Sequence, residues 1–279
     1  DAIEIIGEPA LGHLLAITGL LSPTQNFAYA SIDKGKIRAI ARAHSGPVQE
    51  LEVDREGQIL KTSALTDATV LSLQLANGET GAIQKYRPAQ GAKIAVDATA
   101  SGPRLLLPEN WSTALFDAQS WAGPSGLGIL AINDSAYTYP LPRIAPIKSP
   151  GTFSLPLLIA AAIALENFTP EDPEIRRYLI ASLSEIEGVE IVAPNTEALA
   201  NKISLSVSGV AGEQLVRALA EDEIDVDSGS ACSAADLQPS HVLAAMGYPI
   251  TGHLRLTLHS GTTRSEIDSL KEAISRAIS

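Results

Sequence analysis

Short apolar runs that alternate with helical segments limit the fold of this chain more than any other feature. The first run is followed at Gly7 by a turn and then by a helical stretch, as at the start of an α/β domain. Four runs have the length and composition of buried strands, at residues 3–6, 70–75, 94–98 and 129–132. The first part of the chain therefore predicts an α/β domain.

A different pattern begins after Pro170. Asp172 and the proline after it are typical of the start of a helix, and residues 203–207 alternate between apolar and polar, as in a half-exposed strand. Thr263 and Glu266 have the spacing of a capping box for a last helix. We predict a large α/β domain over residues 1–166 and a small α+β domain over residues 167–279.

Residues 155–166 form an apolar segment between these two regions. Its apolar residues lie on nearly every side of a helix, which predicts a buried helix. The segment is too short to cross a bilayer, which needs about 20 residues. No basic stretch precedes an apolar one near Asp1, so we expect no signal peptide, no membrane and a cytoplasmic location.

Composition excludes several classes of function. The 20 basic and 32 acidic residues give a net charge of −12, and no run of Lys or Arg is present, so we expect no nucleic-acid partner. An acidic surface favours a basic protein partner, although this charge is equally typical of ordinary solubility. One cysteine and five histidines without metal-ligand spacing predict neither a disulfide framework nor a metal site.

Most catalytic motifs are absent. The segment from Gly123 to Leu127 lacks the last glycine of a nucleophile elbow. Gly126 and Gly128 lack the third glycine of a dinucleotide loop, and the chain has no GK[ST] phosphate loop.

The segment around Cys232 is the exception. The single cysteine of the chain lies among small and polar residues, in Ser228-Gly-Ser-Ala-Cys-Ser-Ala-Ala-Asp. Small neighbours leave a thiol accessible and mobile, as a travelling nucleophile requires. The alternative is an inert thiol, which composition alone favours.

This segment resembles the active-cysteine loop of cysteine desulfurases, the NifS/IscS-like branch of the class V aminotransferases. The similarity continues through Arg255-Leu-Thr-Leu to the last helix, and further family motifs occur upstream in the expected order: Ala76-Asn-Gly-Glu-Thr-Gly81, Val96-Asp-Ala98, Gly123-Pro-Ser-Gly-Leu-Gly128 and Pro150-Gly-Thr152. The resemblance implies the fold of pyridoxal-phosphate transferases of fold type I, with a mainly parallel sheet in the large domain. It also implies that the family's N-terminal arm is absent before Asp1.

Several positions that bind the cofactor in the family carry other residues here. The lysine that forms the Schiff base aligns with Ser120, whose hydroxyl cannot form an imine, and Asp117 replaces a serine that contacts the phosphate. A carboxylate at that position would repel a phosphate dianion. The other substituted positions are Gln119 and Lys34 for two histidines, Gly78 for an asparagine, Ala100 for a glutamine and Ala10 for a phosphate-binding threonine.

Four functional positions are retained. The resemblance assigns Asp97 to the pyridinium nitrogen, Thr152 to the phosphate across a dimer interface, Cys232 to sulfur acceptance and Arg255 to the substrate carboxylate. As alternatives, Asp97 caps a strand end and Arg255 pairs with a surface acid. Removing a hydrogen-bonded charged partner from a site costs about 2–5 kcal/mol. We therefore expect no bound cofactor and no desulfurase turnover.

Three functional hypotheses follow from these positions. The first is a non-catalytic pseudoenzyme, a scaffold or regulatory partner in sulfur transfer or iron–sulfur assembly. It would be a homodimer or a heterodimer with a desulfurase paralogue, with a sulfur-acceptor protein as a further partner. The second is a persulfide carrier that uses Cys232. The third is an active pyridoxal-phosphate-dependent desulfurase or aminotransferase with a rewired site, in which Lys34 could serve as the imine-forming lysine.

Overall fold

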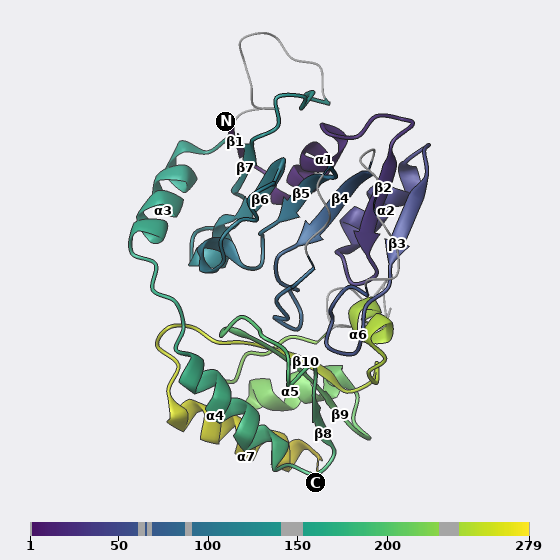
Figure 1. Ribbon diagram of the computed structural model, residues 1–279. Helices are drawn as coiled ribbons and strands as arrows, with labels where there is room; N and C mark the ends of the chain where they lie inside the picture. The colour runs from purple at the N-terminus through teal and green to yellow at the C-terminus, as the bar shows by residue number, and fades with distance from the viewer. Residues whose placement is uncertain are drawn as a thin grey trace. The chain divides into compact units, whose positions relative to one another are not determined.

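The chain forms two compact units in a computed structural model (Figure 1). The structure describes residues 2–60, 65, 69–86, 91–140, 153–228 and 240–278. The first unit comprises the described parts of Asp1–Glu52, Ile59–Ala76 and Gln84–Phe168. The second comprises Val53–Gln58, Asn77–Ile83 and the described parts of Thr169–Ser279. Each unit has its own sheet.

A seven-stranded sheet forms the centre of the first unit. The strand order is β1-β7-β6-β5-β4-β2-β3, and β3, β2, β4, β5 and β6 run parallel to one another. β7 is antiparallel to both β6 and β1. The strands are β1 (Ala2–Ile6), β2 (Asn26–Ala30), β3 (Val48–Leu51), β4 (Thr69–Gln74), β5 (Lys93–Asp97), β6 (Thr113–Asp117) and β7 (Gly128–Ile132).

Two helices cover one face of this sheet. α1 (Pro9–Thr18) buries Leu15 and Ala16 against alternate residues of β1, β6 and β7, among them Leu115 and Leu130. α2 (Gly35–Ala43) buries Ile37 with Phe27 of β2. Fully burying an aliphatic side chain stabilises the fold by about 1.5–3 kcal/mol, so these contacts fix both helices on the sheet.

The helix α3 (Leu155–Glu166) approaches the opposite face. Its Ala161 packs with Trp121, and Phe116 and Ile129 belong to the same cluster. Successive side chains of a strand point to opposite faces, so Phe116 lies across the sheet from Leu115.

The prediction that this helix is buried is wrong. Ala161 is its one buried residue, whereas the side chains of Leu155, Ile159 and Ile163 are 59%, 52% and 55% exposed. A helix that packs on one side of a sheet can bury one stripe only, and its remaining apolar residues then face outward.

The connection between β4 and β5 lacks a helix in its described residues, 75–86 and 91–92. Two parallel strands usually need a helical crossover. Part of this connection, Asn77–Ile83, belongs to the second unit.

The second unit packs helices on an antiparallel sheet in the order β10-β9-β8. Apolar residues of β9, Ile203 and Leu205 among them, form a cluster with residues of α4, α5 and α7. The elements are α4 (Pro173–Ser184), β8 (Val189–Ile191), β9 (Lys202–Val207), α5 (Gly212–Glu221), α6 (His241–Met246), β10 (His253–Thr257) and α7 (Arg264–Ile278).

Local signals in the sequence located the ends of these helices well. Asp172 caps α4 by accepting a hydrogen bond from the Glu174 amide at 2.9 Å. The predicted capping box at Thr263 and Glu266 is confirmed by reciprocal hydrogen bonds.

The expectation that β9 is half-exposed is wrong. Its polar residues Ser204 and Ser206 are buried on the second face of the strand, where they bond to His253 Nε2 at 2.6 Å and to the Pro249 carbonyl at 3.1 Å. Serine can line a buried face when its hydroxyl has such a partner.

None of the helices that the structure describes is long and apolar enough to span a bilayer.

The C-terminal end of α6 provides a test of backbone strain. Gly247 has φ +75° and open space around it, so the Gly247→Ala substitution adds a side chain without a clash but in the left-handed conformation. We expect a loss of about 1 kcal/mol in the free energy of unfolding, measured by urea denaturation. Gly35→Ala is the matched control, because Gly35 also has open space but starts α2 without positive φ. Equal effects of the two substitutions would contradict the assignment of strain.

Candidate functional site

Asp97 is the last residue of β5, a central strand of the parallel part of the large sheet. Its side chain is almost completely buried. Ligands of open α/β sheets bind outside the carboxyl ends of the strands, so Asp97 lies at the edge of the sheet where a binding site is expected.

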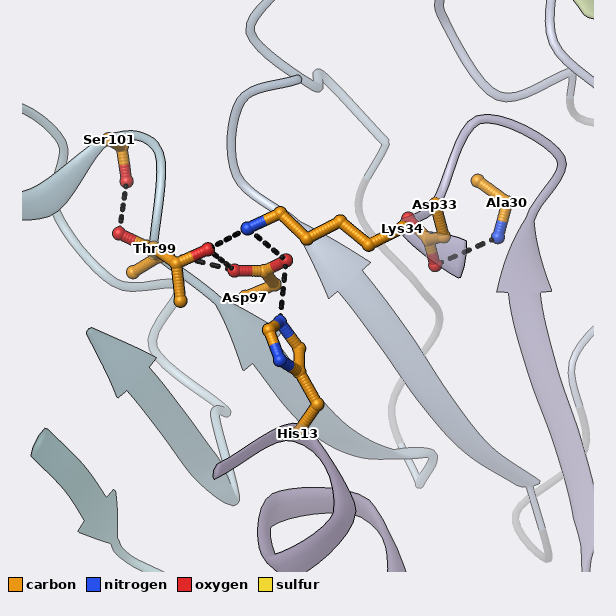
Figure 2. Close-up of polar contacts among 8 residues, drawn as sticks. His13, Ala30, Asp33, Lys34, Asp97, Thr99 and Ser101 are labelled. Carbon is orange, nitrogen blue, oxygen red and sulfur yellow. Dashed lines mark hydrogen bonds and ion pairs between the residues drawn. The ribbon is translucent and has the colours of Figure 1, made fainter. Parts of the chain in front are cut away.

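Figure 2 shows how three neighbours surround the Asp97 carboxylate. Oδ1 accepts hydrogen bonds from the Thr99 amide at 2.9 Å and from the Thr99 hydroxyl. Oδ2 lies 3.2 Å from His13 Nε2 and 3.5 Å from Lys34 Nζ. An ionised carboxylate only accepts hydrogen bonds, so Nε2 of His13 carries the hydrogen.

These contacts keep Asp97 ionised in spite of its position. Burial by itself would raise the pKa of the carboxyl, but the charges of Lys34 and His13 and the hydrogen bonds from His13 and Thr99 outweigh it and hold the pKa well below its usual range. The structure therefore contains a buried negative charge that contacts an imidazole from α1 and an ammonium group from the residue before α2.

Lys34 reaches this cluster from the residue before α2. Its side chain is 33% exposed, and its ammonium group donates a hydrogen bond to the Thr99 hydroxyl as well as pairing with Asp97. The structure thus brings together two of the residues selected from the sequence, Lys34 and Asp97.

Asp33 is a second buried carboxyl next to this cluster. Burial, followed by the charge of Asp97, raises the pKa of Asp33 to about 8. Its Oδ2 accepts a hydrogen bond from the Ala30 amide at 3.2 Å. Asp33 therefore carries a proton at neutral pH, which limits the negative charge buried at the ends of β2 and β5.

Sequence analysis missed His13 and Asp33. His13 lies on α1 next to Leu14 and Leu15, so the sequence alone is more typical of a core histidine than of a site. Asp33 immediately precedes Lys34, and that adjacency was the one available signal. The structure adds a small cavity of about 10 Å³, lined by His13, Ser72 and Asp97 among others, which has room for no more than one water molecule.

The position of the family lysine, Ser120, lies in a short 3-10 turn, η2 (Ala118–Trp121), that follows β6. The Ser120 hydroxyl donates to the Asp117 carbonyl at 2.6 Å, and Asp117 Oδ1 accepts from the Gln119 amide at 3.1 Å. Arg104, at the end of η1 (Gly102–Arg104), donates to the Ser120 carbonyl. The three substituted positions 117, 119 and 120 therefore form one locally bonded turn.

Asp117 is part-buried, and burial raises the pKa of its carboxyl. The hydrogen bond from the Gln119 amide to Asp117 acts in the opposite direction and lowers this pKa.

Three substituted positions have other surroundings. Ala10 lies in the first turn of α1, and Ala100 follows Thr99 in the loop after β5. Gly78 belongs to the second unit, in a turn where the Asn77 side chain accepts from the Glu79 amide at 2.9 Å.

Arg255 lies on β10 of the second unit and pairs with Asp227. The two residues also exchange backbone hydrogen bonds, at 2.7 Å from the Arg255 amide and 3.2 Å from the Asp227 amide. The guanidinium is therefore engaged with a carboxylate of the chain itself. Thr152 and Cys232, the remaining two residues, lie outside the described part of the chain.

No group of three or more histidines, cysteines, aspartates or glutamates within the described ranges could hold a metal ion.

Comparison with known proteins shows which family this chain resembles. Residues 146–270 match the family model of aminotransferase class V. Cysteine desulfurase IscS of Dictyoglomus turgidum is 30% identical over 259 residues, which cover 82% of this chain and 65% of that protein. Cysteine desulfurase IscS of Methanosarcina thermophila is 29% identical over 253 residues, which cover 81% and 63%. The chain therefore spans less than two thirds of the length of these relatives.

Solved structures share the fold. A NifS-like protein matches with a TM-score of 0.83 and 22% identity, covering 99% of this chain and 82% of that one. A NifS-like protein from Rickettsia africae matches with a TM-score of 0.79 and 18% identity over the same shares. At this identity the likeness shows the fold alone, and it confirms the predicted α/β architecture of fold type I.

This chain is similar to cysteine desulfurases over most of its length, and its residues 146–270 match aminotransferase class V.

The family corrects one expectation from the sequence. Aminotransferase class V is a pyridoxal-phosphate-dependent family, so the expectation that this desulfurase-like chain binds no cofactor is contradicted. That expectation treated each substituted contact as a separate loss of binding free energy and added these losses together. Asp97 keeps the negative charge with which a cationic ring nitrogen would pair, and the substitutions elsewhere do not remove that charge.

The residues present fit pyridoxal phosphate at one end. Asp97 would hold the ring nitrogen, and the bound cofactor would supply its capacity to withdraw electrons from an attached amino acid. Ser120 provides no amine for a covalent link. In the alignment with the family motifs, Asp97 is the expected ionic contact with the cofactor, and Ser120 occupies the expected position of the covalent one.

The raised pKa of Asp33 makes stability depend on pH. Between the ordinary value of 3.8 and about 8, the folded state holds a proton that the unfolded chain releases, so the free energy of unfolding falls as pH rises. Asp33→Asn removes this dependence. As the pH rises from roughly 5.5 to 7.5, we expect the free energy of unfolding of the variant to increase by about 2.5 kcal/mol relative to that of the wild type, measured by urea denaturation.

Asp225→Asn is the matched control, because it removes an exposed carboxylate. The difference between this variant and the wild type is expected to stay constant over the same pH range. A constant difference for Asp33→Asn as well would show that Asp33 is ionised in the folded protein.

Proposed function

We propose that this protein acts in sulfur transfer as a non-catalytic cysteine desulfurase homologue, a scaffold or regulatory partner. The observation that carries the proposal is Ser120 at the lysine position, with its hydroxyl bonded to the Asp117 carbonyl. A serine hydroxyl cannot form the carbon–nitrogen double bond through which a lysine amine holds and hands over the cofactor. The proposal concerns this covalent step and is compatible with cofactor bound through Asp97.

Loss of turnover is tested by sulfide release. The protein is incubated with pyridoxal phosphate, L-cysteine and a thiol reductant, and sulfide is measured against pyridoxal phosphate alone. We expect no sulfide above this background. Release that saturates with L-cysteine and disappears in the Cys232→Ala variant would show a working desulfurase and overturn the proposal.

A lysine returned to position 120 tests the assignment of that position. After addition of substoichiometric pyridoxal phosphate and reduction with borohydride, peptide mapping of Ser120→Lys is expected to find the label on residue 120. Gln119→Lys is the matched control, because it adds the same amine one residue earlier, at an exposed side chain. Equal labelling of the two variants would show that position 120 has no special relation to the cofactor.

The exposed apolar side of α3 supports a protein partner. Leu155, Ile159 and Ile163 are four residues apart, so they lie on the same side of the helix, and each is more than half exposed. The helix carries no charged residue before Glu166. We propose that this side pairs with a second copy of the chain or with a desulfurase paralogue.

Light scattering after size-exclusion chromatography tests the pairing. The wild type is expected to have twice the chain mass of 29.2 kDa, and Ile159→Glu with Ile163→Glu is expected to shift it to the single-chain mass, because charges cannot be buried at an apolar contact. Leu106→Glu is the control, since Leu106 is 95% exposed outside α3. A wild type of single-chain mass that also forms no complex with a purified desulfurase would exclude both pairings.

Cys232 supports a second candidate function, because this single cysteine occupies the sulfur-accepting position of the family motif. A persulfide carrier would take sulfur on Cys232 from an active desulfurase, and mass spectrometry of the incubated protein measures this modification. A scaffold needs no such modification. Persulfide on Cys232 that passes to an acceptor protein would replace the scaffold function with the carrier function.

A further inference from the structure

The Asp97 carboxylate is engaged at both oxygens in this structure. Oδ1 accepts hydrogen bonds from the amide and the hydroxyl of Thr99, and Oδ2 lies 3.2 Å from His13 Nε2. The Lys34 ammonium group forms an ion pair with Oδ2 at 3.5 Å. A further cation brought to Oδ2 would therefore compete with Lys34 for the same negative charge.

Lys34 is the donor that can leave at the lowest cost. His13 is buried on α1, and Thr99 is two residues from Asp97 in a buried loop. The Lys34 side chain is one-third exposed, and its flexible four-carbon stem allows the ammonium group to move into water. Its distance of 3.5 Å to Oδ2 is also the longest of those measured to this carboxylate.

Pyridoxal phosphate brings a cationic ring nitrogen of the same charge as the Lys34 ammonium. We propose that Lys34 is an internal counter-ion of Asp97 that competes with the ring nitrogen of pyridoxal phosphate for the carboxylate. Cofactor binding then requires the ammonium group to leave Oδ2, and release of the cofactor lets it return. Lys34 thereby sets the affinity of the site for the cofactor without contributing a bond to it.

The alternative role for Lys34 is a covalent one. An imine forms when a neutral amine attacks the cofactor aldehyde and water leaves. In this structure the Lys34 ammonium group pairs with Asp97 and donates to the Thr99 hydroxyl, and an ammonium group has no lone pair for this attack. The geometry therefore favours competition over covalent capture.

Equilibrium dialysis of the full chain with pyridoxal phosphate tests this inference. Lys34→Met keeps a long apolar stem and removes the charge, so we expect its Kd to be about tenfold lower than that of the wild type. Lys34→Arg keeps the charge and is expected to bind like the wild type. Lys36→Met is the matched control, because Lys36 is exposed in the first turn of α2, two residues after Lys34; the Kd of this variant is expected to stay within about twofold of the wild-type value.

Pyridoxine phosphate, which has the same ring nitrogen and phosphate but no aldehyde, separates the two roles of Lys34. Competition predicts the same ratio of Kd values between wild type and Lys34→Met for both ligands. Thermal denaturation of each variant without ligand shows whether it is folded, and Lys34→Gln replaces Lys34→Met if the latter is not.

Three results would overturn the inference. They are equal Kd values for wild type and the folded Lys34 variant, no measurable binding by either, or borohydride trapping of the cofactor on Lys34. None of these readouts depends on sulfide release, so failure of this inference and failure of the proposed function are separately visible.

Discussion

The buried charge of Asp97 is the interaction on which the site depends. Isolated, an ionised carboxylate in a protein interior would cost many kcal/mol, so the surrounding elements must supply positive charge and hydrogen bonds. His13 from α1, Lys34 from the start of α2 and the loop at Thr99 do so. Asp33 stays protonated and adds no second charge at neutral pH. One carboxylate thus fixes the relative positions of three segments at the same edge of the sheet.

The end of the neighbouring strand, β6, has its polar groups bonded to one another. β5 and β6 are parallel neighbours, so Asp97 and the turn at Ser120 lie at the same edge of the sheet. At Ser120 the hydroxyl, the carboxyl of Asp117 and the guanidinium of Arg104 all bond within the turn region. Under the proposed assignment of these positions, Asp97 provides the ionic contact with the cofactor, whereas the position of the covalent contact is held by hydrogen bonds within a turn.

The sequence predicted those parts of the fold whose signal is local. β4, β5 and β7 are apolar runs, and the caps at Asp172 and Thr263 are short-range hydrogen bonds, so each could be located from a few residues. β2 was missed because its sequence, Asn-Phe-Ala-Tyr-Ala, has neither alternation nor a β-branched residue. The burial of α3 was mispredicted because burial depends on what lies opposite a helix, which composition does not contain.

Two individual residues of the site could be predicted from the sequence, but the contact between them could not. Family resemblance selected Asp97 and Lys34 separately. Nothing in the local sequence indicates that the Lys34 ammonium group contacts the carboxylate of Asp97, which lies 63 positions later in the chain. Treated alone, lysine in place of a histidine is a lost contact with the cofactor ring. Considered together with Asp97, Lys34 is a cation at the carboxylate with which the ring nitrogen would pair. The effect of this lysine therefore depends on whether the cofactor is present. Energies of contacting residues do not add. A count of substituted contacts therefore cannot decide whether such a site binds its cofactor.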